Sequence, residues 1–270
     1  MLSIVDAILL AVLQGITEFL PISSSGHLVI AQSLLNIHSQ AIMSFDVYLH
    51  FGTLISLLVV FWRDVRDMAL SLTHSFSKEN LKGRYQSDDS FRMVVNVLIG
   101  CIPAGVIGVL FNHQIEAIFQ DPKMVAVNLV ITGLILFLTR LSKPEENRKI
   151  GIGFALVIGL AQAVAILPGI SRSGSTIAMG LFLGLMPVLA ARYSFLLSIP
   201  VIAGAALLET KNIFYYASAL GFLPILTGIA MSAVSGYIAI KLLMKVMERG
   251  KFSLFAFYCL IVGALAILFV

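Results

Sequence analysis

The chain has 270 residues, of which 59% are hydrophobic and 12% are charged. A soluble domain would carry about a quarter charged residues, so the composition excludes a soluble globular protein and predicts a polytopic membrane protein. The net charge of +4 does not indicate a nucleic-acid partner, because the basic residues lie in short connections between apolar segments. Cys101 and Cys259 both lie within apolar runs, which predicts buried thiols rather than a disulfide or a metal site.

The first apolar region, residues 4–36, is interrupted by Pro21 and Gly26. It predicts a helix, a polar turn and a second helix, with the turn at membrane depth. Such backbone is tolerated there only where protein or a water-filled cavity surrounds it, so we interpret the region as a re-entrant helical hairpin. Asp6 interrupts its start and no basic stretch precedes it, so we expect this segment to be retained rather than cleaved as a signal peptide.

Six further apolar stretches are long enough to span a hydrocarbon core, which takes about 20 residues. A second broken region, residues 151–190, contains Pro168, Gly169 and Gly174 and predicts another re-entrant hairpin. The sequence therefore predicts an all-α integral membrane protein with a single membrane domain over residues 1–270, six transmembrane helices and two re-entrant helical hairpins. The predicted spans are 42–62, 93–111, 124–140, 193–209, 217–240 and 252–270.

The connections between these segments differ in charge. Residues 63–92, which we expect to form a solvated connection, carry six Lys or Arg, and residues 140–149 and 241–251 carry four each. Residues 112–123 and 210–216 carry one each. Basic connections stay on the cytoplasmic side of a membrane, which places the first three inside the cell and both termini outside. This alternation holds only if each broken region returns to the side from which it entered.

The two broken regions are copies of each other. Residues Gln14–Gly26 and Gln162–Gly174 align without a gap at a constant offset of 148 residues. Each half holds one hairpin and three spans, and three is odd, so the second half enters the membrane upside down relative to the first. The sequence thus predicts an inverted-topology repeat of about 1–140 and about 150–270, an arrangement that places substrate sites near the bilayer midplane.

The two copies differ where chemistry is expected. Glu18 aligns with Ile166, and Ser24 aligns with Arg172. Glu18 shares a helix face with Gln14, and an ionisable group in the apolar zone is costly and functional by default. Its carboxylate is a candidate metal ligand or general acid or base, and a structural ion pair with Arg172 is the alternative.

Hydroxyl groups and an imidazole gather at the start of the helix after the first turn. The free N–H groups and positive dipole end of a helix suit a phosphate, and a run of N-capping serines is the alternative. The second copy adds a guanidinium, whose forked donors match phosphate oxygens. The roles of Asp46 and His50, in the next span, stay open. The candidate site residues are Ser23, Ser24, Ser25 and His27 in the first copy and Ser171, Arg172, Ser173 and Thr176 in the second.

Together these residues resemble the undecaprenyl-pyrophosphate phosphatase family, the bacitracin-resistance type of bacterial inner-membrane enzyme. The family pattern is Glu/Gln-x-x-x-Glu, then P-x-S-S-x-G-H, and later P-G-x-S-R-S-x-x-T. Here the motifs read Gln14-Gly-Ile-Thr-Glu18, Pro21-Ile-Ser-Ser-Ser-Gly-His27 and Pro168-Gly-Ile-Ser-Arg-Ser-Gly-Ser-Thr176. They are complete and in the expected order, and the resemblance covers essentially the whole chain. Gln14 is one of two residues that the family permits, and it removes one carboxylate from a two-carboxylate metal site.

The resemblance implies hydrolysis of undecaprenyl pyrophosphate to undecaprenyl phosphate and inorganic phosphate, which recycles the lipid carrier for cell-wall synthesis. It also implies a divalent cation, Mg²⁺ or Ca²⁺, and a multi-pass protein of the bacterial inner membrane whose active site opens to the periplasmic face. A transporter or flippase for a lipid phosphate is the alternative, because inverted repeats with broken helices are also transporter architecture. A homodimer is left open.

The expected mechanism divides the work between the two copies. Arg172 and the serines of the second motif hold the pyrophosphate and offset charge that grows in the transition state. A divalent ion near Glu18 and Gln14 bridges phosphate oxygens. Ser24 attacks the terminal phosphorus with His27 as base and then as acid. His27 as the nucleophile and direct attack by water are the alternatives.

Overall fold

The computed structural model describes residues 3–34, 40–73, 80–119, 121–208 and 220–269. Within these residues the regular secondary structure is helical throughout. The predicted connection 210–216 lies outside the described residues, as do the ends of the two predicted spans that flank it.

Eight α-helices of the N-terminal half are followed by a short 3₁₀ helix, and five α-helices and a second 3₁₀ helix form the described part of the C-terminal half. The first set is α1 (Ile4–Phe19), α2 (Ser24–Leu34), α3 (Gln40–Val60), α4 (Trp62–Thr73), α5 (Leu81–Ser87), α6 (Asp89–Leu110), α7 (Asn112–Phe119), α8 (Pro122–Leu138) and η2 (Thr139–Leu141). The second set is α9 (Ile152–Val164), α10 (Arg172–Phe182), α11 (Pro187–Leu208), α13 (Phe222–Glu248), η3 (Phe252–Leu254) and α14 (Phe255–Phe269).

Five of the described helices are long and apolar enough to cross a membrane, namely α6, α8 with η2, α11, α13 and η3 with α14. A sixth candidate is α3 together with α4, which are bent by 80° at their junction. An all-helical polytopic membrane protein is thus confirmed. Within residues 63–92, which we expected to form a solvated connection, the structure places α4, α5 and the start of α6.

Two helices continue beyond the apolar stretches that predicted them. Helix α6 begins at Asp89, before the predicted start at residue 93, because the Asp88 carboxylate caps it by accepting from the Ser90 and Phe91 N–H groups. Helix α13 runs on to Glu248, past the predicted end at residue 240. Hydropathy detects only the part of a helix that lies in lipid, so it misses these charged ends.

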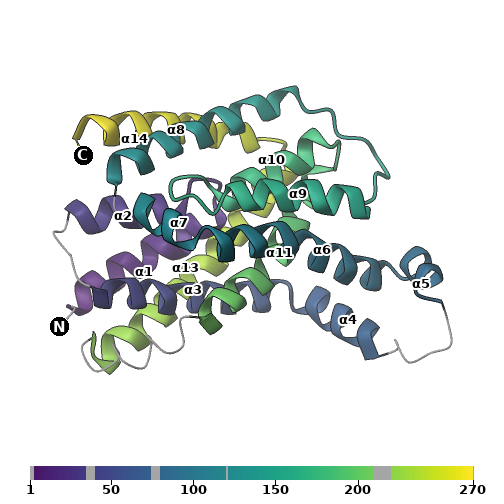
Figure 1. The fold of residues 1–270 in the computed structure, drawn as a ribbon, viewed down its shortest axis with the longest axis horizontal. Coiled ribbons are helices and arrows are strands. Elements are labelled where there is room, and N and C mark those ends of the chain that lie inside the picture. The colour runs from purple at the N-terminus through teal and green to yellow at the C-terminus, as the bar shows by residue number, and fades with distance from the viewer. Residues whose placement is uncertain (1–2, 35–39, 74–79, 120, 209–219, 270) are drawn as a thin grey trace.

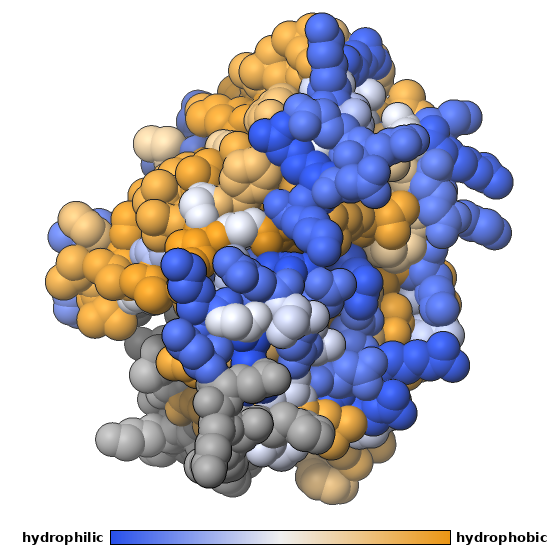
Figure 2. All heavy atoms as spheres, turned by 90° about the vertical axis from the view of Figure 1, so that its right-hand side faces the viewer, coloured by the Kyte–Doolittle hydropathy of each residue, from blue (hydrophilic) through white to orange (hydrophobic). Residues whose placement is uncertain are grey.

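The basic connections gather at one end of the molecule (Figure 1). Helices α4 and α5 lie at the right of that view, whereas α1 begins and α14 ends at the left. The basic connections also contact neighbouring segments: the Lys149 ammonium lies 3.8 Å from the Asp89 carboxylate, and Arg140 Nε donates to Ser253 Oγ over 3.4 Å. Figure 2 shows this end face-on, with hydrophilic side chains covering much of it.

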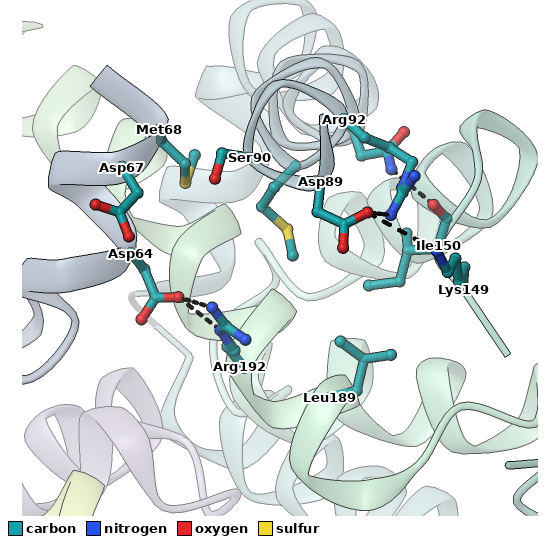
Figure 3. A pocket seen from close by; sticks show the side chains of 12 residues that line it. Asp64, Asp67, Met68, Asp89, Ser90, Arg92, Lys149, Ile150, Leu189 and Arg192 are labelled. Atoms are coloured by element: carbon teal, nitrogen blue, oxygen red, sulfur yellow. Dashed lines mark hydrogen bonds and ion pairs between the residues drawn. The ribbon is translucent and has the colours of Figure 1, made fainter. Parts of the chain in front are cut away.

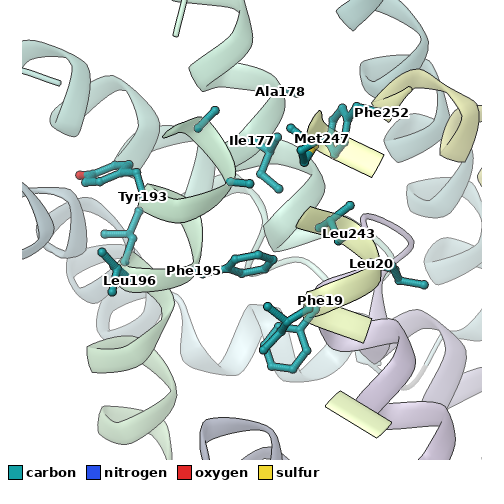
Figure 4. Close-up of a cluster of buried hydrophobic side chains, with 14 of the residues drawn as sticks. Phe19, Leu20, Ile177, Ala178, Tyr193, Phe195, Leu196, Leu243, Met247 and Phe252 are labelled. Atoms are coloured by element: carbon teal, nitrogen blue, oxygen red, sulfur yellow. The ribbon is translucent and has the colours of Figure 1, made fainter. Parts of the chain in front are cut away.

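Long helices of the two halves pack against each other rather than forming two separate bundles. Helix α1 packs along α13, α6 along α9, and α8 along α14. A hydrophobic cluster joins them near the middle (Figure 4), where the Phe19 ring meets the Phe195 ring edge to face at a centroid distance of 5.7 Å. This contact fixes the C-terminal end of α1 against α11, and so positions Glu18, the residue before Phe19.

Candidate active site

The two broken segments meet at their turns. A Cβ atom on Gly26 would lie 3.2 Å from Gly169 Cα, and Ser173 Oγ donates to the Leu20 carbonyl oxygen over 3.2 Å. Gly169 has a φ of +89°, and a Cβ there would lie 2.2 Å from the Val125 carbonyl oxygen, so only glycine fits. The close approach brings the N-termini of α2 and α10 to one place.

A span of the opposite half satisfies the polar backbone of each turn. Asn128 Nδ2 on α8 donates to the Pro168 carbonyl oxygen over 2.8 Å, and Thr132 Oγ1 donates to the Gly169 carbonyl oxygen over 3.0 Å. On α14, the Cys259 thiol donates to the Pro21 carbonyl oxygen over 3.6 Å. Buried backbone polar groups require such partners. No motif in the sequence pointed to Asn128 or Thr132.

Ser23 and Ser171 cap the two short helices, as the N-cap alternative predicted. Ser171 Oγ accepts from Gly174 N over 3.0 Å with an ordinary φ of −73°. Ser23 Oγ accepts from Gly26 N over 3.3 Å, but Ser23 has a φ of +67°, in the left-handed region. Non-glycine residues enter that region at a cost, and such residues cluster at functional sites.

Glu18 is the centre of the polar cluster, and its carboxylate is buried. Oε1 forms an ion pair with the Arg172 guanidinium. Oε2 accepts from Ser24 Oγ over 2.5 Å and from Gln14 Nε2 over 3.0 Å. His50 Nε2 lies 3.6 Å from the same oxygen. The structure therefore joins the carboxylate and hydroxyl of the first copy to the guanidinium of the second.

His50 is a site residue that the sequence analysis left undecided. Its Nδ1 lies 2.8 Å from the Asp46 carbonyl oxygen, one helical turn earlier, which directs Nε2 toward Glu18. The Asp46 carboxylate accepts from Gln32 Nε2 over 3.0 Å at both oxygens. Asp46 thus contacts His50 on the side away from Glu18. The i, i+4 spacing of Asp46 and His50 was the sequence signal that could have predicted that the two residues share a helix face.

His27 lies apart from the predicted nucleophile. Its Nδ1 is 2.8 Å from the Ser23 carbonyl oxygen, and its Nε2 is 2.8 Å from the Tyr258 hydroxyl. The His27 and Tyr258 rings stack at a centroid distance of 5.6 Å. Both ring nitrogens are therefore engaged elsewhere, and the Ser24 hydroxyl donates to Glu18 instead of to His27.

A cavity of about 860 Å³ opens onto this cluster. Its polar end includes Glu18, Ser24 and Arg172, and its walls are apolar segments of α6 and α11 that are rich in small residues. The predicted site residues that line it are Glu18, Ser23, Ser24, Ser25, Ser171 and Arg172, whereas Gln14, His27, Ser173 and Thr176 lie outside its lining. Thr176 Oγ1 instead contacts Ser194 Oγ at 2.6 Å.

A smaller pocket of about 230 Å³ lies at the basic end (Figure 3). It is lined by acids and bases that pair with each other, including Asp64 with Arg192 and Asp89 with Arg92. None of the predicted site residues lines it. The larger cavity is therefore the candidate active site.

The donor set for a metal ion is small. Among the described residues, no group of three or more His, Cys, Asp and Glu side chains is placed to hold one. Glu18 supplies a carboxylate at the cavity, and Gln14 Oε1 is buried without a hydrogen-bond partner in the described part of the chain. Mg²⁺ commonly takes one or two carboxylates and completes its shell with substrate phosphates and water. These oxygens fit a hard cation that shares its ligands with a bound diphosphate.

Comparison with known proteins agrees with this arrangement. The family described as bacitracin resistance protein BacA matches residues 7–265. An undecaprenyl-diphosphatase of Halothermothrix orenii is 44% identical over 99% of this chain and 98% of its own length. Those of Desulforapulum autotrophicum and Methanosphaera stadtmanae are 42% identical over 97% of both chains, and 39% identical over 99% of this chain and 98% of the relative. The chain therefore belongs to the bacitracin resistance protein BacA family.

Proposed function

We propose that this protein hydrolyses undecaprenyl pyrophosphate to undecaprenyl phosphate and inorganic phosphate, and so recycles the lipid carrier for cell-wall synthesis. The observation that carries the proposal is the contact of Glu18 with both Ser24 and Arg172 at the polar end of an otherwise apolar cavity. A diphosphate needs the polar end, and a polyprenyl chain needs the apolar walls. The relatives named undecaprenyl-diphosphatase support the same substrate.

Binding of the diphosphate rests on the second copy. Arg172 and Ser171 line the cavity at the N-terminus of α10, where free N–H groups and the helix dipole favour an anion. In the structure Arg172 is paired with Glu18. The incoming diphosphate would take over that guanidinium, which suits two phosphate oxygens through its forked donors.

Chemistry would begin at the first copy. Ser24 Oγ attacks the terminal phosphorus, and the bond from that phosphorus to the bridging oxygen breaks, so undecaprenyl phosphate leaves. Glu18 Oε2, which already accepts a hydrogen bond from the Ser24 hydroxyl, takes the proton of that hydroxyl. Water then attacks the phosphoserine and the bond from phosphorus to Ser24 Oγ breaks. Glu18 returns its proton to Ser24 Oγ, and the proton of the water leaves with inorganic phosphate. Glu18 replaces His27 as the proposed base, and His27 instead positions the turn by holding the Ser23 carbonyl oxygen.

The proposal includes a divalent cation, Mg²⁺ or Ca²⁺. Glu18 Oε1, once Arg172 has turned to the diphosphate, and Gln14 Oε1 would hold it. When bound, the ion supplies positive charge against the diphosphate oxygens.

We also propose the finer topology of an inverted repeat with six spans and two re-entrant hairpins in the bacterial inner membrane. The cavity is lined by the later parts of α6 (Cys101–Val109) and α11 (Pro200–Ala206), which lead away from the basic end. If the basic end is cytoplasmic, the site opens to the periplasmic face.

Phosphate release from a polyprenyl pyrophosphate by the purified protein in detergent tests the function directly. We expect release that falls on addition of a chelator and returns with Mg²⁺ or Ca²⁺. Binding of the lipid without phosphate release would overturn the hydrolase and favour the transporter or flippase alternative. Single cysteines at positions 82 and 123, probed in whole cells with a membrane-impermeant thiol reagent, test the topology. Labelling at position 82 but not at position 123 would mean that the basic end faces outward, opposite to the proposed orientation.

A further inference from the structure

Gln162 is a buried polar residue of the cavity that has no assigned role. It lies near the end of α9, is 2% exposed, and lines the same cavity as Ser171 and Arg172. Neither Nε2 nor Oε1 of its carboxamide has a hydrogen-bond partner within the described residues. A buried amide with all its hydrogen bonds unmade is strongly disfavoured, so its position against a cavity indicates a ligand that supplies them.

The equivalent residue of the first copy shows why Gln162 is available. Gln14 donates its Nε2 to Glu18 over 3.0 Å and so belongs to the carboxylate cluster. In the second copy the position of Glu18 is taken by Ile166, which also lines the cavity. The amide donor of Gln162 therefore has no carboxylate beside it and can meet an anion in the cavity.

The packing of α9 places Gln162 beside the apolar wall. A Cβ on Gly159 would lie 2.4 Å from the Gly100 carbonyl oxygen, and Ile166 Cδ1 lies 3.9 Å from the Cβ position of Gly108. Helix α9 thus runs along α6 from Gly100 to Gly108, and Gln162 lies between these two contacts. Between the same two contacts, Ala104 and Gly105 of α6 line the apolar wall of the cavity.

We propose that Gln162 is a substrate-binding residue whose Nε2 donates to a non-bridging oxygen of the phosphate that carries the polyprenyl chain. The terminal phosphate lies with Ser24, and the lipid lies against α6 and α11, so the lipid-bearing phosphate is at the level of Gln162. This inference rests on the proposed function, because it assumes that the cavity binds a polyprenyl diphosphate. The terminal phosphate then lies at the copy that contains Gln14, and the lipid-bearing phosphate lies at the copy that contains Gln162.

The test compares Gln162→Met, which keeps the length of the side chain and removes the amide, with the native protein. We expect KM for the polyprenyl pyrophosphate to rise about 10- to 100-fold, the range for losing a hydrogen bond to a charged group. Product inhibition by undecaprenyl phosphate should weaken by a similar factor, whereas inhibition by inorganic phosphate should stay within about 2-fold. Thermal stability should be unchanged or higher, because the unpartnered amide is gone.

Ser175→Ala is the matched control, because the Ser175 hydroxyl is also buried without a partner in the described residues but lies outside the cavity lining. Its KM and product inhibition should equal those of the native protein. Gln162→Glu, of the same shape but with a negative charge, should bind more weakly than Gln162→Met, and it serves as the second variant if Gln162→Met does not fold. Native KM in either folded variant overturns the inference while native hydrolysis leaves the proposed function intact. Equal weakening of inhibition by both products overturns the assignment to the lipid-bearing phosphate.

Discussion

The turn between α1 and α2 and the turn between α9 and α10 occupy equivalent places in the two halves, but they present opposite charges to one cavity. The first carries the Glu18 carboxylate and the Ser24 hydroxyl, and the second carries Ile166 and the Arg172 guanidinium at the same aligned positions. The carboxylate that accepts from the Ser24 hydroxyl comes from the first half, and the guanidinium proposed to bind the phosphate comes from the second. The site is complete only where the halves meet.

The two turns also differ in how their backbone is held. The second turn places its left-handed residue at Gly169, where the conformation carries no side-chain penalty. The first places it at Ser23, where it costs roughly 1–3 kcal/mol. His27 contacts the Ser23 carbonyl oxygen through both its backbone N–H, at 3.2 Å, and its ring Nδ1, at 2.8 Å. The strained turn is therefore the one that presents the proposed nucleophile and has an imidazole to fix it.

The largest effect is expected from removing Ser24, the proposed nucleophile of the first turn. Ser24→Ala should lower hydrolysis by at least about 10³-fold, the scale seen when a catalytic nucleophile is removed. Substrate binding should persist, because Arg172 and Ser171 are unchanged. Phosphate release and binding of a polyprenyl pyrophosphate would be measured on the same preparation. Ser25→Ala, also at the cavity, is the control and should lose far less activity.

Trapping of the intermediate identifies the phosphorylated group. Rapid quenching of the native protein with terminally labelled substrate should trap a phosphoserine, which survives acid. An acid-labile label that disappears in His27→Ala would instead make His27 the nucleophile. No label at all, with Ser24→Ala still active, would favour direct attack by water.

The next largest effect concerns the guanidinium of the second turn. Arg172→Lys keeps the positive charge but loses the forked donors, so it should lose about 2–4 kcal/mol of transition-state stabilisation, as for one oxyanion donor. The measurement is kcat/KM for phosphate release. Arg192→Lys is the matched control, because Arg192 pairs with Asp64 outside the cavity, and its activity should be native. Near-native activity of folded Arg172→Lys would show that the forked contact is not needed.

A smaller effect separates a positioning role of His27 from a role as base. His27→Ala should lose roughly 10-fold in kcat, because the Ser23 turn loosens, and added imidazole should not restore it. A base would contribute about 10²–10⁴-fold, and imidazole would return part of the rate. Tyr258→Phe removes only the hydroxyl that lies 2.8 Å from His27 Nε2 and should lose less than His27→Ala. Rescue by imidazole would restore His27 as the base.

The places of the two turns were predictable from the sequence, whereas some of their side-chain contacts were not. Two motifs with a constant offset located both broken segments, and α2 and α10 begin at the aligned residues Ser24 and Arg172. The ion pair of Glu18 with Arg172 was expected only as the alternative to a metal ligand or a general acid or base, on the ground that an unpaired charge in lipid is costly. The pairing of Ser24 did not, because a three-residue spacing from His27 does not fix where either side chain points. The left-handed Ser23 and the Tyr258 hydroxyl, contributed by α14, decide that.

The supports of the turns had no local signal at all. Asn128 and Thr132 read as isolated polar residues in an apolar span, and their partners Pro168 and Gly169 lie 40 and 37 residues further along the chain. Their role as hydrogen-bond donors to the second turn is visible only once α8 is packed against that turn. The charged start of α6 and the charged end of α13 were missed for a different reason, since helices continue outside the lipid where hydropathy carries no information.

The smallest effect, on stability, tests whether the two supporting spans are equivalent. Asn128→Leu keeps the branched shape of the side chain but leaves the buried Pro168 carbonyl oxygen without its donor, which should destabilise the protein by about 1–3 kcal/mol. Cys259→Ala removes the corresponding donor to Pro21, but a thiol is a weak donor and this contact is 3.6 Å long. Its cost should be about 1 kcal/mol or less.

Thermal unfolding of both variants in the same detergent would measure the difference. Because the Pro21 turn is also fixed by His27, it should tolerate the loss of its span contact better than the Pro168 turn does. Equal destabilisation by the two substitutions would contradict this view, and would mean that the strained first turn depends on α14 as much as the second turn depends on α8.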